Sequence, residues 1–117
     1  MDVEHARFNM VEQQIRPWEV LDPRVLEVLQ YTPRERFVPD HLRNLAFSDM
    51  NLPIGHDEVM LAPKQEGRIA QAAELGPDER ILEIGTGCGY LTACLARLGG
   101  HVTSVDLYDD FLQQADD

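Results

Sequence analysis

Apolar residues in the first quarter of the chain recur at helical spacing. The two stripes are Val11 and Ile15, followed by Val25, Leu26, Val28 and Leu29. This pattern predicts helix over residues 4–31. Pro17 interrupts it and predicts a break near residues 16–18, because proline lacks an N–H donor and restricts the residue before it. Asp22 followed by Pro23 is typical of a new helix start.

The pattern becomes less regular after residue 31. Thr32 and Pro33 repeat the helix-start pair and predict a short helical turn that ends at residues 37–39. We interpret Arg34 and Arg36 in this turn as part of a solvated face. Asp40 is predicted to cap another short helix that runs to Leu45.

Residues 46–63 are rich in turn formers, so we predict irregular structure there and interpret His56 as a surface-loop histidine. Pro63 begins a predicted helix that runs to about Leu75, where Gly76 and Pro77 stop it.

Strand-like and helix-like patterns alternate in the last third. Residues 80–84 form a short apolar run, 85–89 a glycine-rich turn, 90–98 an amphipathic helix and 101–106 a second strand. This order predicts a βαβ unit with parallel strands, the only two strands expected in the chain. A further helix is predicted to begin near Tyr108.

The excess of acidic residues argues against a polyanionic partner. The 117 residues contain 21 Asp and Glu against 10 Lys and Arg, a net charge of −11. Phosphate contacts require clustered basic residues, so we expect no nucleic-acid partner. We expect a cytoplasmic protein without a membrane partner, because the chain has no apolar run of membrane-spanning length and no secretory signal. The two cysteines and four scattered histidines show no metal-ligand spacing, so no metal is expected.

The turn between the predicted strands carries the candidate chemistry. Glycines at 85, 87 and 89 allow a tight turn and a close approach of a ligand to the backbone. The helix that follows presents its free N–H groups to the same place. Asp106 ends the neighbouring strand, where a carboxylate is suited to accept hydrogen bonds from a ribose diol. We therefore predict a nucleoside cofactor.

The glycine spacing separates two classes of cofactor. The dinucleotide fingerprint G-x-G-x-x-G fails, because Tyr90 occupies the position of its third glycine. The observed order is E-x-G-x-G-x-G, in which Glu83 suits the cationic S-adenosyl-L-methionine. The predicted cofactor-binding residues are Glu83, Gly85, Thr86, Gly87, Cys88, Gly89, Tyr90, Asp106 and Leu107. Cys88 is interpreted as a small residue that the turn tolerates.

Three stretches together resemble the protein-L-isoaspartate O-methyltransferase family. They are PRERFVP at residues 33–39, PIG at 53–55 and LEIGTGCGY at 82–90. The resemblance implies an α/β, truncated Rossmann-like methyltransferase fold with an N-terminal helical subdomain. It also implies methyl transfer from S-adenosyl-L-methionine to an isoaspartyl carboxylate of a protein or peptide, a repair reaction. We expect a helical segment and PIG loop at residues 1–62 and an incomplete cofactor domain at 63–117.

Two departures from the family keep other functions open. Val59 and Leu61 stand where the family has threonine and serine, and neither side chain donates a hydrogen bond. The chain also ends one predicted helix after the second strand, so we expect a fragment that is inactive in catalysis and self-associates. The alternatives are a methyltransferase with a different acceptor and a non-catalytic folded module. No catalytic residue is assigned, because a carboxylate acceptor is already nucleophilic and needs no general base.

Overall fold

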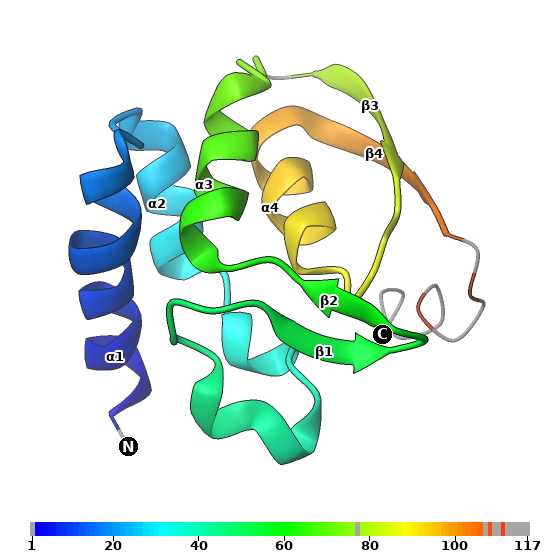
Figure 1. The fold of residues 1–117 in the computed structure, drawn as a ribbon. Coiled ribbons are helices and arrows are strands. Elements are labelled where there is room, and N and C mark those ends of the chain that lie inside the picture. The colour runs from blue at the N-terminus through cyan, green and yellow to red at the C-terminus, as the bar shows by residue number, and fades with distance from the viewer. Residues whose placement is uncertain (1, 77, 107, 109–110, 112–117) are drawn as a thin grey trace.

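The computed structural model describes residues 2–76, 78–106, 108 and 111. Helices α1 (Val3–Met10), α2 (Pro23–Tyr31) and α3 (Pro63–Ala72) lie together on one side of the molecule (Figure 1). Helix α4 (Tyr90–Gly99) lies between them and the parallel strands β3 (Glu79–Ile84) and β4 (Gly100–Val105). A separate hairpin of β1 (Leu52–Gly55) and β2 (Glu58–Met60) lies across one end.

The predicted break in the first helical segment is confirmed. Helix α1 begins at the cap residue Asp2, whose side chain accepts a hydrogen bond from the amide of His5 at 3.1 Å. It continues as a π-helical turn, Val11–Ile15, and a 3₁₀ turn, Arg16–Trp18, which contains Pro17. Helix α2 then starts as predicted, with the Asp22 side chain accepting from the Arg24 amide at 2.9 Å.

The core extends from the N-terminal helices to α4 and the β1–β2 hairpin. Met10, Ile15, Val20 and Leu29 are each at most 1% exposed. Helix α3 approaches this cluster closely at Gly67, where an added Cβ would lie only 2.9 Å from Cγ2 of Ile15. A side chain at this position would therefore separate α3 from the preceding helices.

The prediction of irregular structure is wrong for residues 52–60, as is the expectation of only two strands. Strands β1 and β2 pair antiparallel, with Leu52 opposite Met60. Both residues of their connection, His56 and Asp57, have positive φ, of 55° and 58°, as in tight hairpin turns. Strands of three and four residues leave little alternation to read in the sequence, so only their pairing reveals them.

Two boundaries of the predicted helices also move. Residues Asp40–Leu45 form a 3₁₀ helix, but its first flanking residue is Pro39, and the Asp40 carboxylate pairs with Arg43. Helix α3 ends at Ala72 and not at Leu75. The chain leaves α3 early because Glu74 adopts a left-handed φ of 49°.

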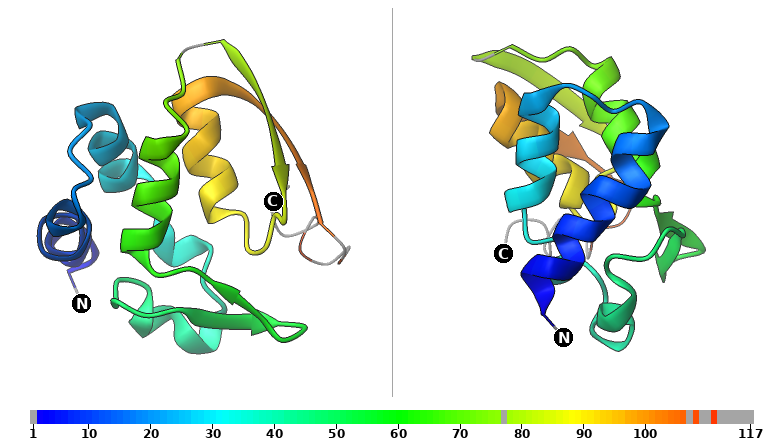
Figure 2. Two further views of the ribbon diagram at one scale, coloured as in Figure 1. Left: turned by 45° about the horizontal axis from the view of Figure 1, so that its top comes forward. Right: turned by 90° about the vertical axis from the view of Figure 1, so that its left-hand side faces the viewer.

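The predicted βαβ unit is confirmed. Strands β3 and β4 pair in parallel from Glu79 opposite Gly100 to Ile84 opposite Val105, with α4 packed on one face. Figure 2 shows the other face of the pair turned away from the helices. Leu82, Ile84 and Val105 are exposed on the strands by 65%, 82% and 44%. The helix expected near Tyr108 falls almost wholly outside the described residues, and none of the described helices is long and apolar enough to cross a bilayer.

Candidate functional site

The glycine turn leaves β3 and enters α4 through three left-handed residues. Gly85, Gly87 and Gly89 have φ of 96°, 56° and 91°, values that residues other than glycine rarely adopt. At the start of the turn, the amides of Gly85 and Thr86 donate to the carbonyl of Val105 at 2.7 and 3.2 Å. The turn is therefore attached to the end of β4 as well as to β3.

Asp106 is brought to this turn, as its position at the end of the second strand predicted. Its Oδ2 accepts a hydrogen bond from the Gly87 amide at 2.8 Å, and its Oδ1 accepts from the Tyr108 amide at 3.1 Å. Each carboxylate oxygen has further lone pairs, so Asp106 keeps acceptor capacity. Leu107, predicted beside it, lies outside the described residues.

Glu83 faces α4 from the middle of the site. Its side chain is buried, and Oε1 accepts hydrogen bonds from the hydroxyls of Thr92 and, at 2.6 Å, Ser104. Ser104 also contacts the hydroxyl of Thr86. These contacts join β3, β4, α4 and the glycine turn, so Glu83 has a structural role whatever else it does.

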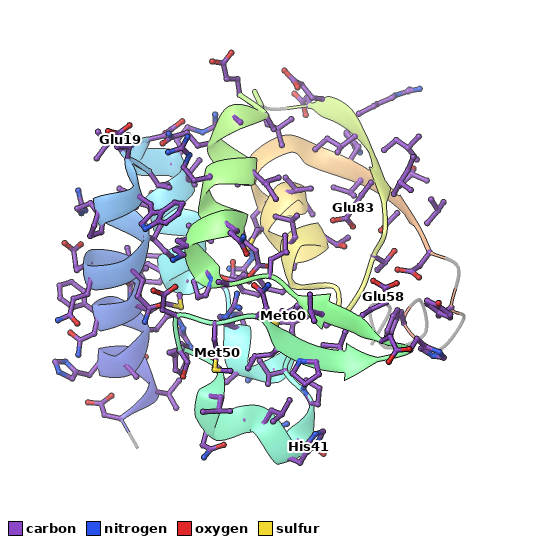
Figure 3. The ribbon with its side chains drawn as sticks, in the orientation of Figure 1. Glu19, His41, Met50, Glu58, Met60 and Glu83 are labelled. Atoms are coloured by element: carbon purple, nitrogen blue, oxygen red, sulfur yellow. The ribbon has the colours of Figure 1, made fainter. Side chains whose placement is uncertain are left out.

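A cavity of about 420 Å³ opens at the carboxyl ends of β3 and β4. One wall contains Gly85, Gly87 and Asp106, and the opposite wall contains Glu58 and Val59 from the hairpin. Figure 3 shows Glu58 near the tip of the hairpin and Glu83 between the strands and α4. In doubly wound α/β folds, ligands bind at this end of the strands.

Aromatic rings connect the hairpin tip to the chain after β4. The imidazole of His56 stacks on the ring of Tyr108, with centroids 3.9 Å apart and planes at 10°. The ring of Phe111 lies edge-on to both rings, at 5.3 and 5.6 Å. His56 is exposed as predicted, but it belongs to the rim of the cavity, since Tyr108 and Phe111 line it.

Cys88 and Tyr90 turn inward from the glycine turn. Burial raises the pKa of the Cys88 thiol to about 11, so the thiol stays protonated near neutral pH. This agrees with the interpretation of Cys88 as a small packing residue. Tyr90, the first residue of α4, is 1% exposed, with its ring edge-on to Phe37 at 5.7 Å.

Arg34 is the residue that sequence reasoning placed wrongly. It was expected on a solvated face, but its side chain is fully buried and forms an ion pair with buried Glu66 of α3. Its guanidinium also lies over the Tyr90 ring, 4.7 Å from the centroid. Burial raises the pKa of the Glu66 carboxyl to about 7, and the contact with Arg34 opposes that rise. A three-residue 3₁₀ turn is too short to show a periodicity that would reveal burial. The one available signal was that Arg34 belongs to the PRERFVP stretch shared with the family.

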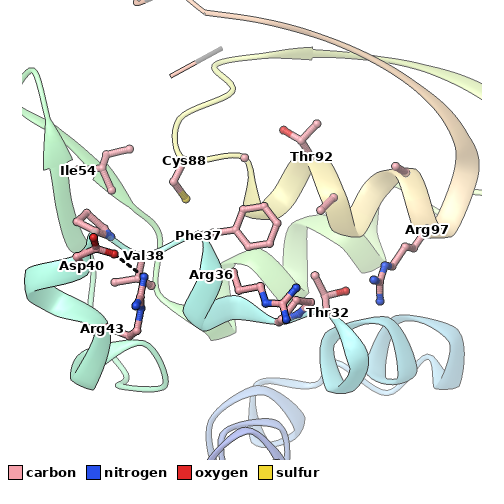
Figure 4. Close-up of a pocket in the computed structure, with 15 residues that line it drawn as sticks. Thr32, Arg36, Phe37, Val38, Asp40, Arg43, Ile54, Cys88, Thr92 and Arg97 are labelled. Atoms are coloured by element: carbon pink, nitrogen blue, oxygen red, sulfur yellow. Dashed lines mark hydrogen bonds and ion pairs between the residues drawn. The ribbon is translucent and has the colours of Figure 1, made fainter. Parts of the chain in front are cut away.

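A second cavity, of about 880 Å³, lies between α4 and residues 32–43 (Figure 4). Three arginines line it: Arg36, Arg43 and Arg97. Arg43 pairs with Asp40, and Arg97 donates to the carbonyl of Tyr31 at 2.9 Å. Cys88 and Gly89 line it too, so the glycine turn and the first turn of α4 separate it from the strand-end cavity.

Comparison with known proteins assigns the chain to a family. The sequence profile of the protein-L-isoaspartate(D-aspartate) O-methyltransferases matches residues 5–117. The chain belongs to this family. A protein-L-isoaspartate O-methyltransferase of Picosynechococcus sp. is 45% identical over 111 residues, which are 95% of this chain and 50% of the relative. Protein-L-isoaspartate O-methyltransferase 1 of Rhodopseudomonas palustris is 43% identical over 86% of this chain and 41% of the relative. The chain thus spans about half the length of the curated relatives it matches.

Solved structures confirm the predicted fold. A Plasmodium falciparum protein of the family, crystallised in complex with S-adenosyl-L-homocysteine, superposes with a TM-score of 0.75 at 19% identity. It aligns with 93% of this chain and 52% of its own. A second protein-L-isoaspartate O-methyltransferase gives a TM-score of 0.78 at 23% identity, covering 94% and 37% of the two chains. The chain therefore has the first part of the α/β methyltransferase fold of this family.

Proposed function

We propose that the cavity at the ends of β3 and β4 binds S-adenosyl-L-methionine. The observation that carries the proposal is that the left-handed glycine turn and Asp106 line one cavity at the carboxyl ends of adjacent parallel strands. The acceptor capacity of Asp106 suits the ribose hydroxyls of the cofactor. Gly85 and Gly87 have no side chain, so a ligand can approach the backbone there. Their positive φ would also strain any other residue at these positions.

The remaining predicted residues receive proposed roles by position. We propose that the Glu83 carboxylate, at the end of β3 before the turn, faces the cationic part of the cofactor. Both hydrogen bonds from Thr92 and Ser104 go to its Oε1 and not to its Oε2. Thr86, Cys88, Gly89 and Tyr90 shape the turn itself. Leu107 follows Asp106 directly in the sequence, which is the reason to keep it in the proposed set.

The reaction we propose is methyl transfer to an isoaspartyl carboxylate, the activity for which the relatives are named. S-adenosyl-L-methionine, when bound, supplies an electrophilic methyl group on its sulfonium. An acceptor carboxylate already carries the electron pair that would attack this methyl group, so the chain would need no general base. The role of the chain is to orient the reactants and exclude water.

A different methyl acceptor is the second candidate. Val59 is 47% exposed and lines the cavity beside Glu58. Neither side chain donates a hydrogen bond to a carboxylate, and the charge of Glu58 repels one. These two positions favour an acceptor that carries no negative charge but has a free lone pair, such as a deprotonated amine. A folded module that binds the cofactor without catalysis is the third candidate.

Calorimetric titration with S-adenosyl-L-homocysteine tests the cofactor site. Asp106→Ala should weaken binding by about 10- to 100-fold, the effect of losing a hydrogen bond to a charged group. Glu27→Ala is the matched control, since it removes one acid from α2, outside the cavity at the strand ends. Equal affinities in wild type and Asp106→Ala would remove Asp106 from the site.

Transfer of labelled methyl groups separates the three candidates. We expect this 117-residue chain to bind the cofactor without methylating an isoaspartyl peptide at a useful rate, because Val59 and Leu61 replace the family's hydroxyl residues. Transfer to the isoaspartyl peptide, lost in Gly87→Val, would establish the family activity and contradict this expectation. Transfer only to amine-containing peptides would select the second candidate, and binding without any transfer the third.

For partners and location, we propose that the chain is cytoplasmic, binds no nucleic acid or membrane, and self-associates. The net charge of −11 supports the absence of a polyanionic partner. The exposed apolar face of β3 and β4 supports self-association, because an uncovered strand face and edge tend to pair with another chain.

A further inference from the structure

The guanidinium of Arg34 connects four segments of the chain inside the protein. Its Nε donates to the carbonyl of Ala46 at 2.7 Å, and its Nη2 donates to the carbonyl of Leu61 at 3.0 Å. Nη1 pairs with Glu66, and the planar group lies over the ring of Tyr90. A lysine would reproduce the charge but not this set of directions, because only arginine has a planar fork that also stacks on a ring.

Arg34, Glu66 and Tyr90 form the Arg34 cluster, and Tyr90 is its residue next to the glycine turn. It follows Gly89 directly and begins α4. Arg34 packs on its ring at 4.7 Å, and Phe37 packs edge-on at 5.7 Å. Both partners come from residues 34–37, so the N-terminal segment determines where the first residue of α4 lies.

The two ends of the glycine turn are attached differently. The entrance is attached to β4 by the amides of Gly85 and Thr86, which share the Val105 carbonyl. At the exit, the amide of Gly89 donates to Thr86 and the amide of Ala93 donates to Gly89, both at 3.0 Å. These exit bonds are local to the turn and α4. The ring of Tyr90 attaches the exit to residues 34–37, and the Thr92 hydroxyl attaches the first turn of α4 to Glu83 of β3.

We propose that Arg34, paired with Glu66, is a positioning residue that fixes the exit of the glycine turn through Tyr90 and thereby supports cofactor affinity. The affinity part rests on the proposed function, because it requires S-adenosyl-L-methionine to bind at the turn. The conformational part concerns the protein without ligand. Arg34 itself does not line the strand-end cavity.

Hydrogen exchange of single amides tests the conformational part. In Arg34→Met the exit amides of Gly89 and Ala93 should exchange at least about tenfold faster than in wild type, since the ring contact that restricts them is lost. The entrance amides of Gly85 and Thr86 should keep their relative protection. Arg34→Lys should recover stability through Glu66 without recovering protection at the exit.

Leu29→Ala is the matched control for general destabilisation. Leu29 is a buried core residue of α2 outside the Arg34 cluster. Exchange is compared at denaturant concentrations where both variants have the same free energy of unfolding. Equal changes at the entrance and exit amides in Arg34→Met, or the same exit-specific change in Leu29→Ala, would overturn the proposal.

Titration with S-adenosyl-L-homocysteine tests the affinity part. Arg34→Met should weaken binding by about tenfold, and a double-mutant cycle with Tyr90→Leu should show that the two losses are not additive. Additive losses would overturn the link through Tyr90. If wild type binds no cofactor, the proposed function fails for this chain, and the exchange experiment alone decides whether Arg34 positions the turn.

Discussion

The N-terminal helices and the β3–α4–β4 unit bury their apolar side chains to different degrees. Around α1, α2 and α3, residues such as Ile15 and Val20 are completely buried. On β3, Leu82 and Ile84 expose more than half of their surface, although they alternate with side chains that face α4. The four helices therefore enclose the core, including Cys94 of α4, while the candidate site lies at the less covered strands. The Arg34 cluster and α3 connect the two.

Removal of Arg34 should have the largest effect on stability. In Arg34→Met the buried Glu66 carboxyl loses its partner and must either stay charged without compensation or take up a proton, so we expect a loss of about 3–5 kcal/mol at pH 8. Denaturant unfolding measures it. Arg16→Met is the control, because its pair with Glu12 is exposed and such pairs contribute about 0–1 kcal/mol. Similar losses in the two variants would show that the cluster is no stronger than a surface pair.

The stability of the protein should depend on the protonation of Glu66. Its pKa is about 7 in the folded state, above the ordinary value of 4.5, so the folded state holds the proton more tightly than the unfolded state. The resulting stabilisation is complete below pH 4.5 and is lost as the pH rises to about 7. Relative to Glu66→Gln, wild type should therefore lose on the order of a few kcal/mol between these values.

Unfolding titrations of both proteins across this range measure the difference. Burial raises the pKa of Cys88 to about 11 and of Cys94 to about 12, and raises that of Tyr90 well above 10, so these neighbours do not titrate in the range. Arg34 stays charged across this range, and the charge of Glu83 is part of the Glu66 shift that the comparison measures. A difference that stays constant with pH would contradict the expectation.

Alanine substitutions at Gly67 and Gly99 show how well each region tolerates an added methyl group. Gly67→Ala should destabilise the protein by about 1–3 kcal/mol, because its Cβ would meet the fully buried Ile15 at 2.9 Å. Gly99→Ala should cost less than about 1 kcal/mol, because the one close contact of its Cβ, at 2.6 Å, is with Cδ1 of Ile81, the end of a side chain that can turn away. Adding Ile81→Val, which removes that end, should relieve the remaining cost. Thermal unfolding measures all three, and a larger cost at Gly99 would reverse the comparison.

Substitution on the exposed sheet face should affect stability least and assembly most. Ile84 is 82% exposed, so Ile84→Thr should change the free energy of unfolding by no more than about 0.5 kcal/mol. Wild type should self-associate at micromolar concentration, whereas Ile84→Thr should approach the monomer mass of 13.3 kDa. Light scattering after size exclusion measures both masses. A monomeric wild type would remove the self-association proposal.

Some parts of the fold could be predicted from the sequence and others could not. The βαβ unit was predicted with its strand order, and Asp106 was brought to the glycine turn as expected, because its two strands and connecting helix are adjacent in sequence. The β1–β2 hairpin was missed, since its strands are too short to show alternation. The early end of α3 was missed because it depends on a single left-handed residue, Glu74.

The sequence by itself determined the βαβ unit, the starts of α2 and α3, the family and the candidate cofactor residues. Glycine spacing, proline positions and helix caps act within a few residues, so they can be read without knowing the fold. Only the tertiary structure decided that Arg34 is buried against Glu66 and Tyr90, and that the hairpin forms one wall of the cavity. These contacts join residues that lie far apart in the chain. Burial of a charge depends on which distant partners compensate for its lost hydration, and that information exists only once the chain has folded.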